Sequence, residues 1–576
     1  MRFVGSMANR NNMKNGVKMN VTRRNFVKGG AFVTAGIAGI GGLALSGCTP
    51  NAGSKVGETS AVNPVSPHKW EVKPEPIDEK DIAETVDADI VIVGAGTAGV
   101  AAAHSAAEAG AKVVLIEKTD SISARGHDVG CVGTRLHKEA GVDIDICEMR
   151  EYYAQITSSK VDLNLFNIWA NHSGEVMDYY LDAMEQRGVP AYLVPVAEDI
   201  YTSPNACTRE YQTAIDFGEK GKGQKTEEGE FINHRFVRIV SEMAVEEGAD
   251  IRFNMKAEQL IRENNGPVTG VIASNSDGKY VRFNASKGVI LATGGITENE
   301  DMLKTWAPLA VHCNQILYPD LTGNEGDGLC MGMWVGAAPQ KGNAAIMGLP
   351  SGAATGGYLS SGDKKWDRLG WLNVNLNGER YTNEKCSGPR GVFAALQQPN
   401  CTCYSIFDSE FENKVHEQNP AIDLGDTIEK DIEKSVSEGT LFVADTLDDL
   451  ASAFGAPADV FKATVARYND LCALGKDEDF SKVANCLNTI TTPPFYASLV
   501  KCAVLVVIYG LNVDSHARVC DENDVPIDNL YAIGNVMGNM ITDSYPYLVP
   551  GISHGRCITF GRKLAQALVN GELLSA

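Results

Sequence analysis

The sequence predicts an α/β fold built around a parallel, Rossmann-like sheet, and three observations near residue 90 carry this prediction. Residues 88–93 (ADIVIV) form a short, apolar, β-branched run of the kind that fills a buried parallel strand. A glycine-rich turn and an alanine-rich stretch of helical length follow at residues 94–110, and such small side chains allow close packing on a sheet. A second apolar run at residues 112–116 (KVVLI) then ends in Glu117. The order of strand, turn, helix, strand and acid predicts a βαβ unit.

The turn has the spacing of a dinucleotide-binding fingerprint, G-x-G-x-x-G, at residues 94–99. In that fingerprint Gly94 makes the tight turn, Gly96 lets the backbone approach a pyrophosphate at the helix N-terminus, and Gly99 lets the helix touch the strand. An acid at the end of the second strand holds ribose hydroxyls. The residues predicted to contact the cofactor here are Gly94, Gly96, Thr97, Ala98, Gly99, Glu117 and Lys118. The fingerprint alone does not distinguish FAD from NAD.

The first 48 residues have the features of an export signal. Residues 22–28 (TRRNFVK) resemble the twin-arginine motif, and seven glycines in residues 29–47 make a weak membrane helix, since each interior Gly costs about 1 kcal/mol relative to Ala. Residues 45–48 (LSGC) resemble a lipobox, which predicts that Cys48 is lipidated. A permanent membrane anchor and an ordinary cysteine after a cleaved signal remain the alternatives. Because the twin-arginine route exports folded proteins, it suits a chain that carries a cofactor out of the cytoplasm.

Charge and composition restrict the partners of the remaining chain. The net charge of the 576 residues is −22, and the first 48 residues hold seven Lys or Arg and no acid, so the rest carries −29. Such an acidic surface makes nucleic acid an improbable partner. Residues 49–86 are rich in Gly, Ser, Pro and charge, which predicts a flexible linker over residues 48–86 after a signal peptide at 1–47.

Five further segments, in chain order, carry a resemblance to a known family. They are residues 287–295 (KGVILATGG), 326–328 (GDG), 377–384 (NGERYTNE), 463–470 (ATVARYND), and the closing pair 530–535 (LYAIGN) with 558–562 (ITFGR). With these motifs the chain is similar, over about residues 86–570, to the fumarate reductase/succinate dehydrogenase flavoprotein family, especially to its exported single-chain reductases.

The resemblance implies FAD as the cofactor and a divided architecture. An FAD-binding domain would be split between residues 87–343 and 505–576, and an α+β cap domain would be inserted at residues 344–504. A single nucleotide fingerprint, and export to a compartment where free NADH is not expected, also favour FAD over NAD. The resemblance implies further FAD contacts at Ala292, Thr293, Gly294, Asp327, Gly534, Asn535, Gly551 and Ile552.

Three departures from the family concern the substrate. Fumarate reductases bind the two substrate carboxylates with two histidines and an arginine, and alignment places Gly348, Val506 and Leu548 at these positions. Because desolvated carboxylates need charged or hydrogen-bonding partners, this pocket is poorly suited to a dicarboxylate. We expect a small, apolar conjugated carbonyl compound in place of fumarate.

The candidate catalytic residues also come from resemblance. Arg390 lies two residues beyond the position of the family's proton-donating arginine, and a small loop insertion would bring it to the same point; a surface arginine is the alternative. Tyr547 and Gly551 fall where the 3-ketosteroid dehydrogenases of this superfamily hold the substrate carbonyl oxygen. Two donors aimed at one oxygen stabilise a developing enolate. The alternative is a tyrosine that only packs in a turn.

These features predict an exported, lipid-anchored FAD oxidoreductase that reduces an activated C=C bond in an enone, enoate or unsaturated lactone. No C-x-x-C-H haem motif or FMN-acceptor motif occurs in the sequence, so a membrane cytochrome or quinol-oxidising partner would supply the electrons. A 3-ketosteroid-type dehydrogenase running the reverse reaction is one alternative. A flavoprotein subunit that only transfers electrons, without a substrate of its own, is another.

The sequence leaves two questions about the cofactors open. Some family members attach FAD covalently through a histidine, and an ungapped alignment puts Arg125, rather than His127, near that position. Thirteen cysteines follow Cys48, an odd number that disulfides cannot pair completely. Buried free thiols and an iron–sulfur cluster both remain compatible with them.

Overall fold

The computed structural model describes residues 68–124, 126, 128–195, 211–220, 225–226, 229–313, 315–316, 323–351, 370–385, 389–418 and 428–576, with the backbone alone at 315, 349–351, 389–390, 418 and 501. The predicted signal peptide, Cys48, Arg125 and His127 lie outside the described residues. Residues Ser66–Ala576 form one compact unit.

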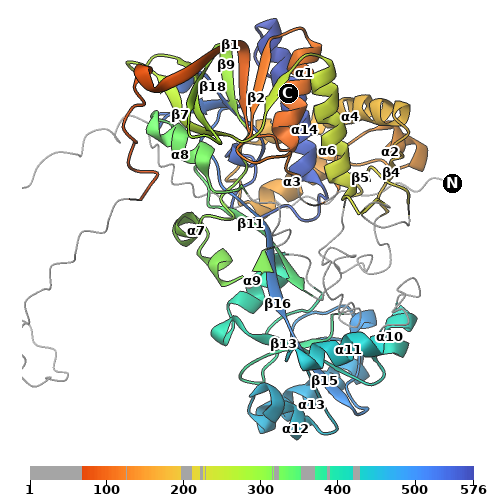
Figure 1. Ribbon diagram of the computed structural model, residues 1–576. Coiled ribbons are helices and arrows are strands. Elements are labelled where there is room, and N and C mark those ends of the chain that lie inside the picture. The colour runs from red at the N-terminus through yellow and green to blue at the C-terminus, as the bar shows by residue number, and fades with distance from the viewer. Residues whose placement is uncertain are drawn as a thin grey trace, which may run out of the picture. The chain divides into compact units, whose positions relative to one another are not determined.

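A twisted, mainly parallel sheet is the centre of the larger part of this unit (Figure 1). Its strands lie in the order β17 (Arg518–Cys520), β18 (Pro526–Ala532), β9 (Tyr280–Leu291), β1 (Ile82–Val93), β2 (Val113–Ile116) and β6 (Asp250–Arg252). An antiparallel pair, β7 (Met255–Arg262) and β8 (Val268–Asn275), joins this sheet through β9. The parallel pairing of β1 with β2 and with β9 confirms the predicted Rossmann-like fold.

Helices cover this sheet, and the one that follows the glycine turn consists mostly of small residues. The predicted alanine-rich helix is α1 (Thr97–Glu108), which is buried along its length up to Ala107. It packs against α14 (Ile552–Asn570) and α6 (Ile232–Glu246), and α4 (Leu163–Gln186) packs against α14 (Figure 1). A Cβ atom at Gly561 of α14 would lie 2.6 Å from the carbonyl oxygen of Ala98, so glycine is needed where these two helices touch.

A second, antiparallel sheet forms the region in which the sequence predicts the cap domain. Its strands are β12 (Leu372–Asn375), β13 (Cys403–Asp408), β15 (Phe495–Leu499) and β14 (Leu441–Ala444). Its helices are α10 (Phe411–Gln418), α11 (Ile428–Ser437), α12 (Leu447–Phe454) and α13 (Ala458–Leu474). These elements enclose apolar clusters of their own, separate from the main core. The exact boundaries of the predicted domains stay a prediction.

Three strands, β10 (Gln315–Ile316), β16 (Lys501–Ile508) and β11 (Ala345–Ser351), connect the two regions. A small sheet of β3 (Val129–Gly130), β5 (Ala214–Asp216) and β4 (Tyr192–Leu193) lies beside α14. The remaining helices are α2 (Arg135–Ala140), α3 (Ile146–Ile156), α7 (Glu300–Trp306), α8 (Asp327–Trp334) and α9 (Pro389–Leu396).

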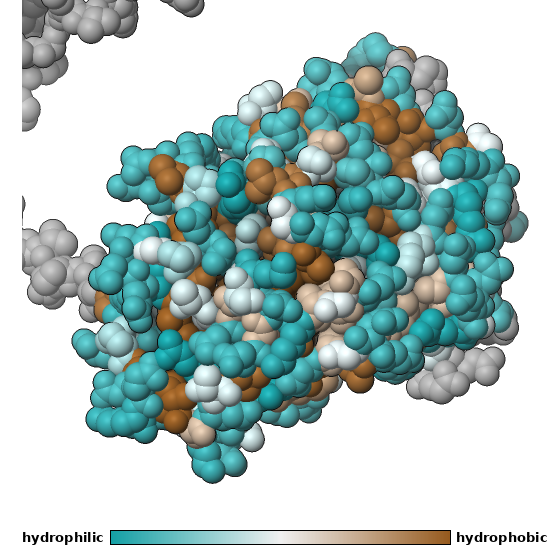
Figure 2. Space-filling model, turned by 90° about the horizontal axis from the view of Figure 1, so that it is seen from above, coloured by the Kyte–Doolittle hydropathy of each residue, from teal (hydrophilic) through white to brown (hydrophobic). Residues whose placement is uncertain are grey.

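The surface is mostly polar. The face shown in Figure 2 is largely hydrophilic, with hydrophobic residues interspersed, in keeping with the acidic composition. None of the helices in the described part of the chain is long and apolar enough to cross a membrane.

Candidate cofactor and substrate site

A cavity opens where four parallel strands of the main sheet end. Val93 closes β1, Ile116 closes β2, and Ala292 and Gly534 follow β9 and β18; all four residues line the cavity. Ligands of open α/β sheets bind at this carboxyl edge. The lining extends from the glycine turn at Gly94 and Gly96 to Met347 of β11 and Leu505 of β16, which suits a long ligand such as a dinucleotide. All the predicted cofactor residues line the cavity except Gly99 and Ile552, which are buried behind it.

The three glycines of the turn differ in what surrounds them. A Cβ at Gly99 would lie 1.9 Å from the carbonyl oxygen of Gly94, and a Cβ at Gly94 would lie 2.5 Å from that of Ala292. These two glycines therefore bring helix and strands together. A Cβ at Gly96 would meet only the carbonyl oxygen of Ser123, at 3.4 Å. Gly96 faces the cavity, so a side chain there would occupy space that a ligand needs.

Backbone N–H groups fix the carboxylate of Glu117 at the end of β2. The Ala95 N–H donates to Glu117 Oε2 at 2.8 Å, and the Thr119 N–H donates to Oε1 at 2.9 Å. The Thr119 hydroxyl also donates to Oε1, at 3.0 Å, so Oε2 is the oxygen that keeps a lone pair for a ribose hydroxyl.

Lys118 next to it is engaged at the cavity rim. Its Nζ pairs with Glu325 at 2.6 Å and with Asp327 at 2.7 Å. Burial opposes the charge of Lys118, but the two carboxylates outweigh it and raise the pKa of this ammonium. Lys118 therefore orders the rim by pairing with Asp327, another of the predicted cofactor residues.

Polar groups without partners point to a bound ligand. Thr293 Oγ1 is buried and has no hydrogen-bond partner among the described residues. The Asn535 side chain accepts from Arg556 through Oδ1 at 2.7 Å, and its Nδ2 has no acceptor in the described part of the chain. A dinucleotide is rich in the acceptor oxygens that such donors require, so these residues fit one.

The structure adds residues to this wall that the sequence did not single out. The lining includes Ser123, Asp128, Tyr545, Ser553 and His554. His554 Nδ1 lies 3.2 Å from Thr97 Oγ1, which joins the first turn of α14 to that of α1. His554 could have been predicted from the sequence, because it follows the predicted FAD contacts Gly551 and Ile552 by only a few residues. No sequence pattern, in contrast, distinguishes Tyr545 from its neighbour Tyr547.

The cavity has an apolar wall on the connecting strands. Met347 of β11 pairs with Val506 of β16, and both line the cavity together with Leu505. Gly348, the next residue of β11, pairs with Val504, and a Cβ there would lie 3.0 Å from the Val392 side chain. Two of the three positions that carry substrate-binding side chains in fumarate reductases thus lie on adjacent strands and hold no polar group.

The three predicted catalytic residues differ in whether they line the cavity. Tyr547 is half-buried and packs against the cluster of Ala503 and Leu505, although it does not itself line the cavity. Gly551 lines the cavity in a left-handed conformation (φ 73°), and its N–H has no acceptor among the described residues. Arg390 is the second residue of α9, and its side chain lies outside the described part of the chain.

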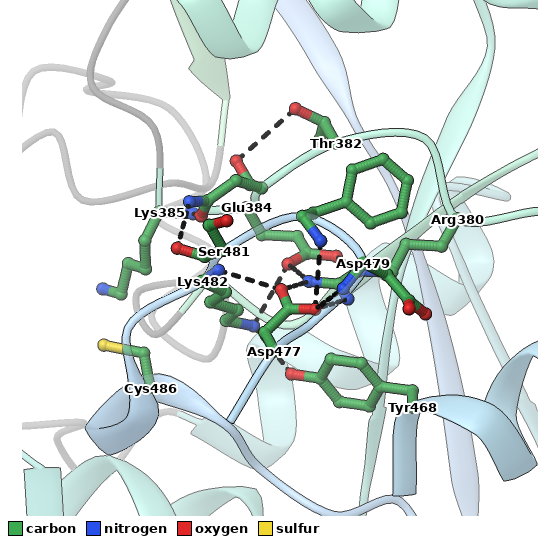
Figure 3. A network of polar contacts seen from close by, with 12 residues as sticks. Arg380, Thr382, Glu384, Lys385, Tyr468, Asp477, Asp479, Ser481, Lys482 and Cys486 are labelled. Atoms are coloured by element: carbon green, nitrogen blue, oxygen red, sulfur yellow. Dashed lines mark hydrogen bonds and ion pairs between the residues drawn. The ribbon is translucent and has the colours of Figure 1, made fainter. Parts of the chain in front are cut away.

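A buried ion network holds the segment that leads to Arg390 (Figure 3). Arg380 donates to both oxygens of Glu384, at 2.8 and 2.9 Å, and to both oxygens of Asp477, at 3.0 and 2.8 Å. Lys482 Nζ donates to the Tyr468 hydroxyl at 2.7 Å and lies 3.3 Å from Glu384. Such paired forks are strong and directional, so the network fixes the start of this segment.

The described cysteines are free thiols, and several of them cluster near β16. Cys403 and Cys502 belong to an apolar cluster against which Cys313 and Cys401 pack. Burial raises the pKa of Cys502 to about 12, which keeps this thiol protonated and unreactive. No group of three or more His, Cys, Asp or Glu side chains within the described ranges is arranged to hold a metal ion.

Comparisons with known proteins identify the family of the chain. A family model described as FAD binding domain matches residues 89–547. The chain is 26% identical to the vinyl phenol reductase of Lactiplantibacillus plantarum over 505 residues, covering 82% of this chain and 94% of that protein. It is 26% identical to a fumarate reductase (cytochrome) of Shewanella frigidimarina, with 82% and 76% covered. It is 24% identical to the 3-oxosteroid 1-dehydrogenase of Mycolicibacterium smegmatis, with 82% and 95% covered.

Solved structures support the same fold. The open conformation of a flavocytochrome c3 fumarate reductase has a TM-score of 0.61 and 23% identity, with 88% of this chain and 82% of that chain covered. The chain belongs to the FAD binding domain family, and it is an FAD-dependent oxidoreductase that acts on CH–CH groups, related to fumarate reductases and 3-ketosteroid dehydrogenases.

Proposed function

We propose that the protein reduces an activated C=C bond next to a carbonyl group in an uncharged substrate. The observation that carries the proposal is that one cavity is lined both by the apolar wall of Met347, Leu505 and Val506 and by Gly551, whose N–H has no acceptor among the described residues. An uncharged enone, enoate ester or unsaturated lactone suits this pairing, because its carbon skeleton packs on the wall and its carbonyl oxygen accepts the hydrogen bond. Fumarate does not suit it, because nothing on this wall would pair its carboxylates.

The residues of this chain would act on the substrate as follows. The predicted cofactor residues around the cavity would hold FAD, which would supply the hydride for the β-carbon. The Gly551 N–H donates to the carbonyl oxygen and stabilises the negative charge that develops there, and the hydroxyl of Tyr547, which packs against Leu505 at the edge of the cavity, is the proposed second donor. Arg390 gives a proton to the α-carbon, so that a hydride and a proton are added across the double bond. The surrounding apolar residues exclude water.

The origin of the electrons and the location of the protein belong to the same proposal. A membrane cytochrome or quinol-oxidising protein would reduce the flavin. Twin-arginine export and a lipid on Cys48 would hold the enzyme on the outer face of the cytoplasmic membrane, near such a donor.

A screen of flavin reoxidation tests the proposal. The protein is reduced anaerobically with dithionite, excess reductant is removed, and uncharged enones, enoate esters and unsaturated lactones are added with fumarate as the comparison. We expect an uncharged conjugated compound, and not fumarate, to restore the absorbance of oxidised flavin within seconds. Reoxidation by fumarate alone would contradict the proposed substrate class.

The reverse reaction is the second candidate, and the 3-oxosteroid 1-dehydrogenase relative favours it. Oxidised protein mixed with a saturated ketone and an artificial electron acceptor would then form the enone. If neither direction turns over with any compound, a subunit that only transfers electrons becomes the better interpretation.

A further inference from the structure

Arg556 is a buried cation that no carboxylate of the described chain pairs. The residue is fully buried in the second turn of α14. Its Nη2 donates to Asn535 Oδ1 at 2.7 Å, while Nε and Nη1 have no hydrogen-bond partner among the described residues. An isolated buried charge is costly, and proteins usually pair it.

Arg562, on the same helix, shows the usual arrangement. Its Nη1 lies 2.9 Å from Glu108 Oε2 and donates to Ser105 Oγ at 3.0 Å. Its guanidinium also stacks 3.6 Å above the ring of Tyr179. Arg562 thus has a carboxylate partner, whereas Arg556 on the same helix has none among the described residues. Its position in α14 therefore does not explain why Arg556 lacks an anionic partner.

The partner of Arg556 leads to the cofactor cavity. An arginine can only donate, so the contact fixes the amide of Asn535 with its oxygen toward Arg556 and leaves both hydrogens of Nδ2 free beside the cavity. Asn535 also lies near the end of β16, because a Cβ at Gly295 would be 3.6 Å from Asn535 Cβ and 2.4 Å from the carbonyl oxygen of Val507. A charged donor polarises the amide and strengthens the bonds that its hydrogens make.

We propose that Arg556, acting through the Asn535 amide, is a positioning residue that raises the reduction potential of the bound flavin. Reduction adds two electrons and one proton to the flavin, which gains one negative charge when its N1 position stays deprotonated. A fixed positive charge behind a polarised donor favours this reduced form over the oxidised one. The inference rests on the proposed FAD site, with Asn535 as a predicted contact of the cofactor, and it holds whichever substrate is used.

The test is a dye-coupled potentiometric titration of the FAD-loaded protein without substrate. Arg556→Gln removes the charge, and Asn535→Asp keeps the shape but places a carboxylate that neutralises it. We expect both variants to shift the equilibrium toward the oxidised flavin at least tenfold relative to the wild type. For a two-electron couple this shift is a fall of about 30 mV in the reduction potential. Arg556→Lys should keep most of the wild-type potential, and Arg562→Gln is the matched control that should change the equilibrium less than twofold.

A second readout separates the charge from packing. The pKa of the reduced flavin, followed by its absorbance from pH 5 to 9, should rise in Arg556→Gln and Asn535→Asp because the nearby positive charge is removed or cancelled. If Arg556→Gln does not fold, Asn535→Asp alone decides the question. If the equilibrium between oxidised and reduced flavin in Asn535→Asp stays within twofold of the wild type, the proposal is overturned. Failure of the wild-type protein to be reoxidised by any conjugated carbonyl would contradict only the proposed function.

Discussion

Gly96 and Gly99 show, at the scale of single residues, how one motif serves two purposes. Gly99 is needed for folding, because a side chain there would overlap the backbone of Gly94. Gly96 has an ordinary extended backbone (φ −80°, ψ −177°) and open space beside it, so the apoprotein tolerates a side chain that the cofactor does not.

We therefore expect Gly96→Val to fold and to lose FAD. The valine side chain would fill the approach to the pyrophosphate, so the ratio of flavin absorbance to protein absorbance should fall at least tenfold, with circular dichroism unchanged. Gly96→Ala should show an intermediate loss. Full FAD content in Gly96→Val would show that the cofactor does not approach the backbone here.

Tyr547→Phe tests the proposed donor to the substrate carbonyl. Because this hydrogen bond strengthens as the enolate forms, its loss should lower kcat by on the order of 10²–10³ and change KM much less. Steady-state kinetics with the best substrate of the reoxidation screen measure both constants. Tyr545→Phe is the matched comparison, and a wild-type rate in Tyr547→Phe with a large loss in Tyr545→Phe would move the role to the tyrosine that lines the cavity.

At the scale of elements, the ion network of the cap region connects α13 to the segment before Arg390 (Figure 3). Its members are almost completely buried: the side chain of Arg380 is 6% exposed, and those of Glu384, Asp477 and Lys482 are 0% exposed. Burial alone would raise the pKa of Asp477, but hydrogen bonds from Arg380 and from backbone N–H groups outweigh it and lower this pKa to about 2.

This shift gives the stability of the protein a definite pH dependence. The folded-state pKa lies below the ordinary value, so the stabilisation by Asp477 is complete above about pH 4 and is lost as the pH falls toward 2. We expect Asp477→Asn to lower the free energy of unfolding by on the order of 3 kcal/mol at pH 6, with a smaller difference at pH 3. Urea unfolding followed by circular dichroism measures this. Asp479→Asn, in the same loop but in an exposed pair with Arg467, should cost less than about 1 kcal/mol.

Elements defined by local patterns were predictable, and elements defined by distant partners were not. The first strand, α1 and β2 follow from a local pattern of apolar and small residues, and the structure confirms them. Strand β1 nevertheless starts at Ile82, earlier than its apolar run, because residues 82–87, in which polar and apolar side chains are mixed, also pair with β9. The sheet of β11 and β16 joins segments about 150 residues apart, and their pairing has no local signal. Arg556 and Asn535 likewise meet only in the folded chain.

At the scale of the whole molecule, the acidic, folded unit and its basic N-terminal segment suggest a protein exported after it has bound FAD. Replacing Arg23 and Arg24 with lysine should block the twin-arginine route and leave folded, flavin-containing precursor in the cytoplasm. Fractionation and immunoblotting measure the distribution, and Cys48→Ala is the companion variant, which should be exported but released from the membrane. Normal export of the double lysine variant would contradict the proposed route.

The last prediction concerns the source of electrons. The sequence contains a single dinucleotide fingerprint, and the structure places it on the cavity to which the FAD site is assigned, so no second nucleotide fold is expected to bind NADH. Purified protein should therefore be reduced by dithionite or by a low-potential viologen dye within seconds, and by excess NADH at least a hundredfold more slowly. Stopped-flow absorbance of the flavin under anaerobic conditions measures both rates. When membranes that contain a quinol donor are added to the purified protein, the flavin should be reduced rapidly. Fast reduction by NADH alone would show that the enzyme needs no external partner.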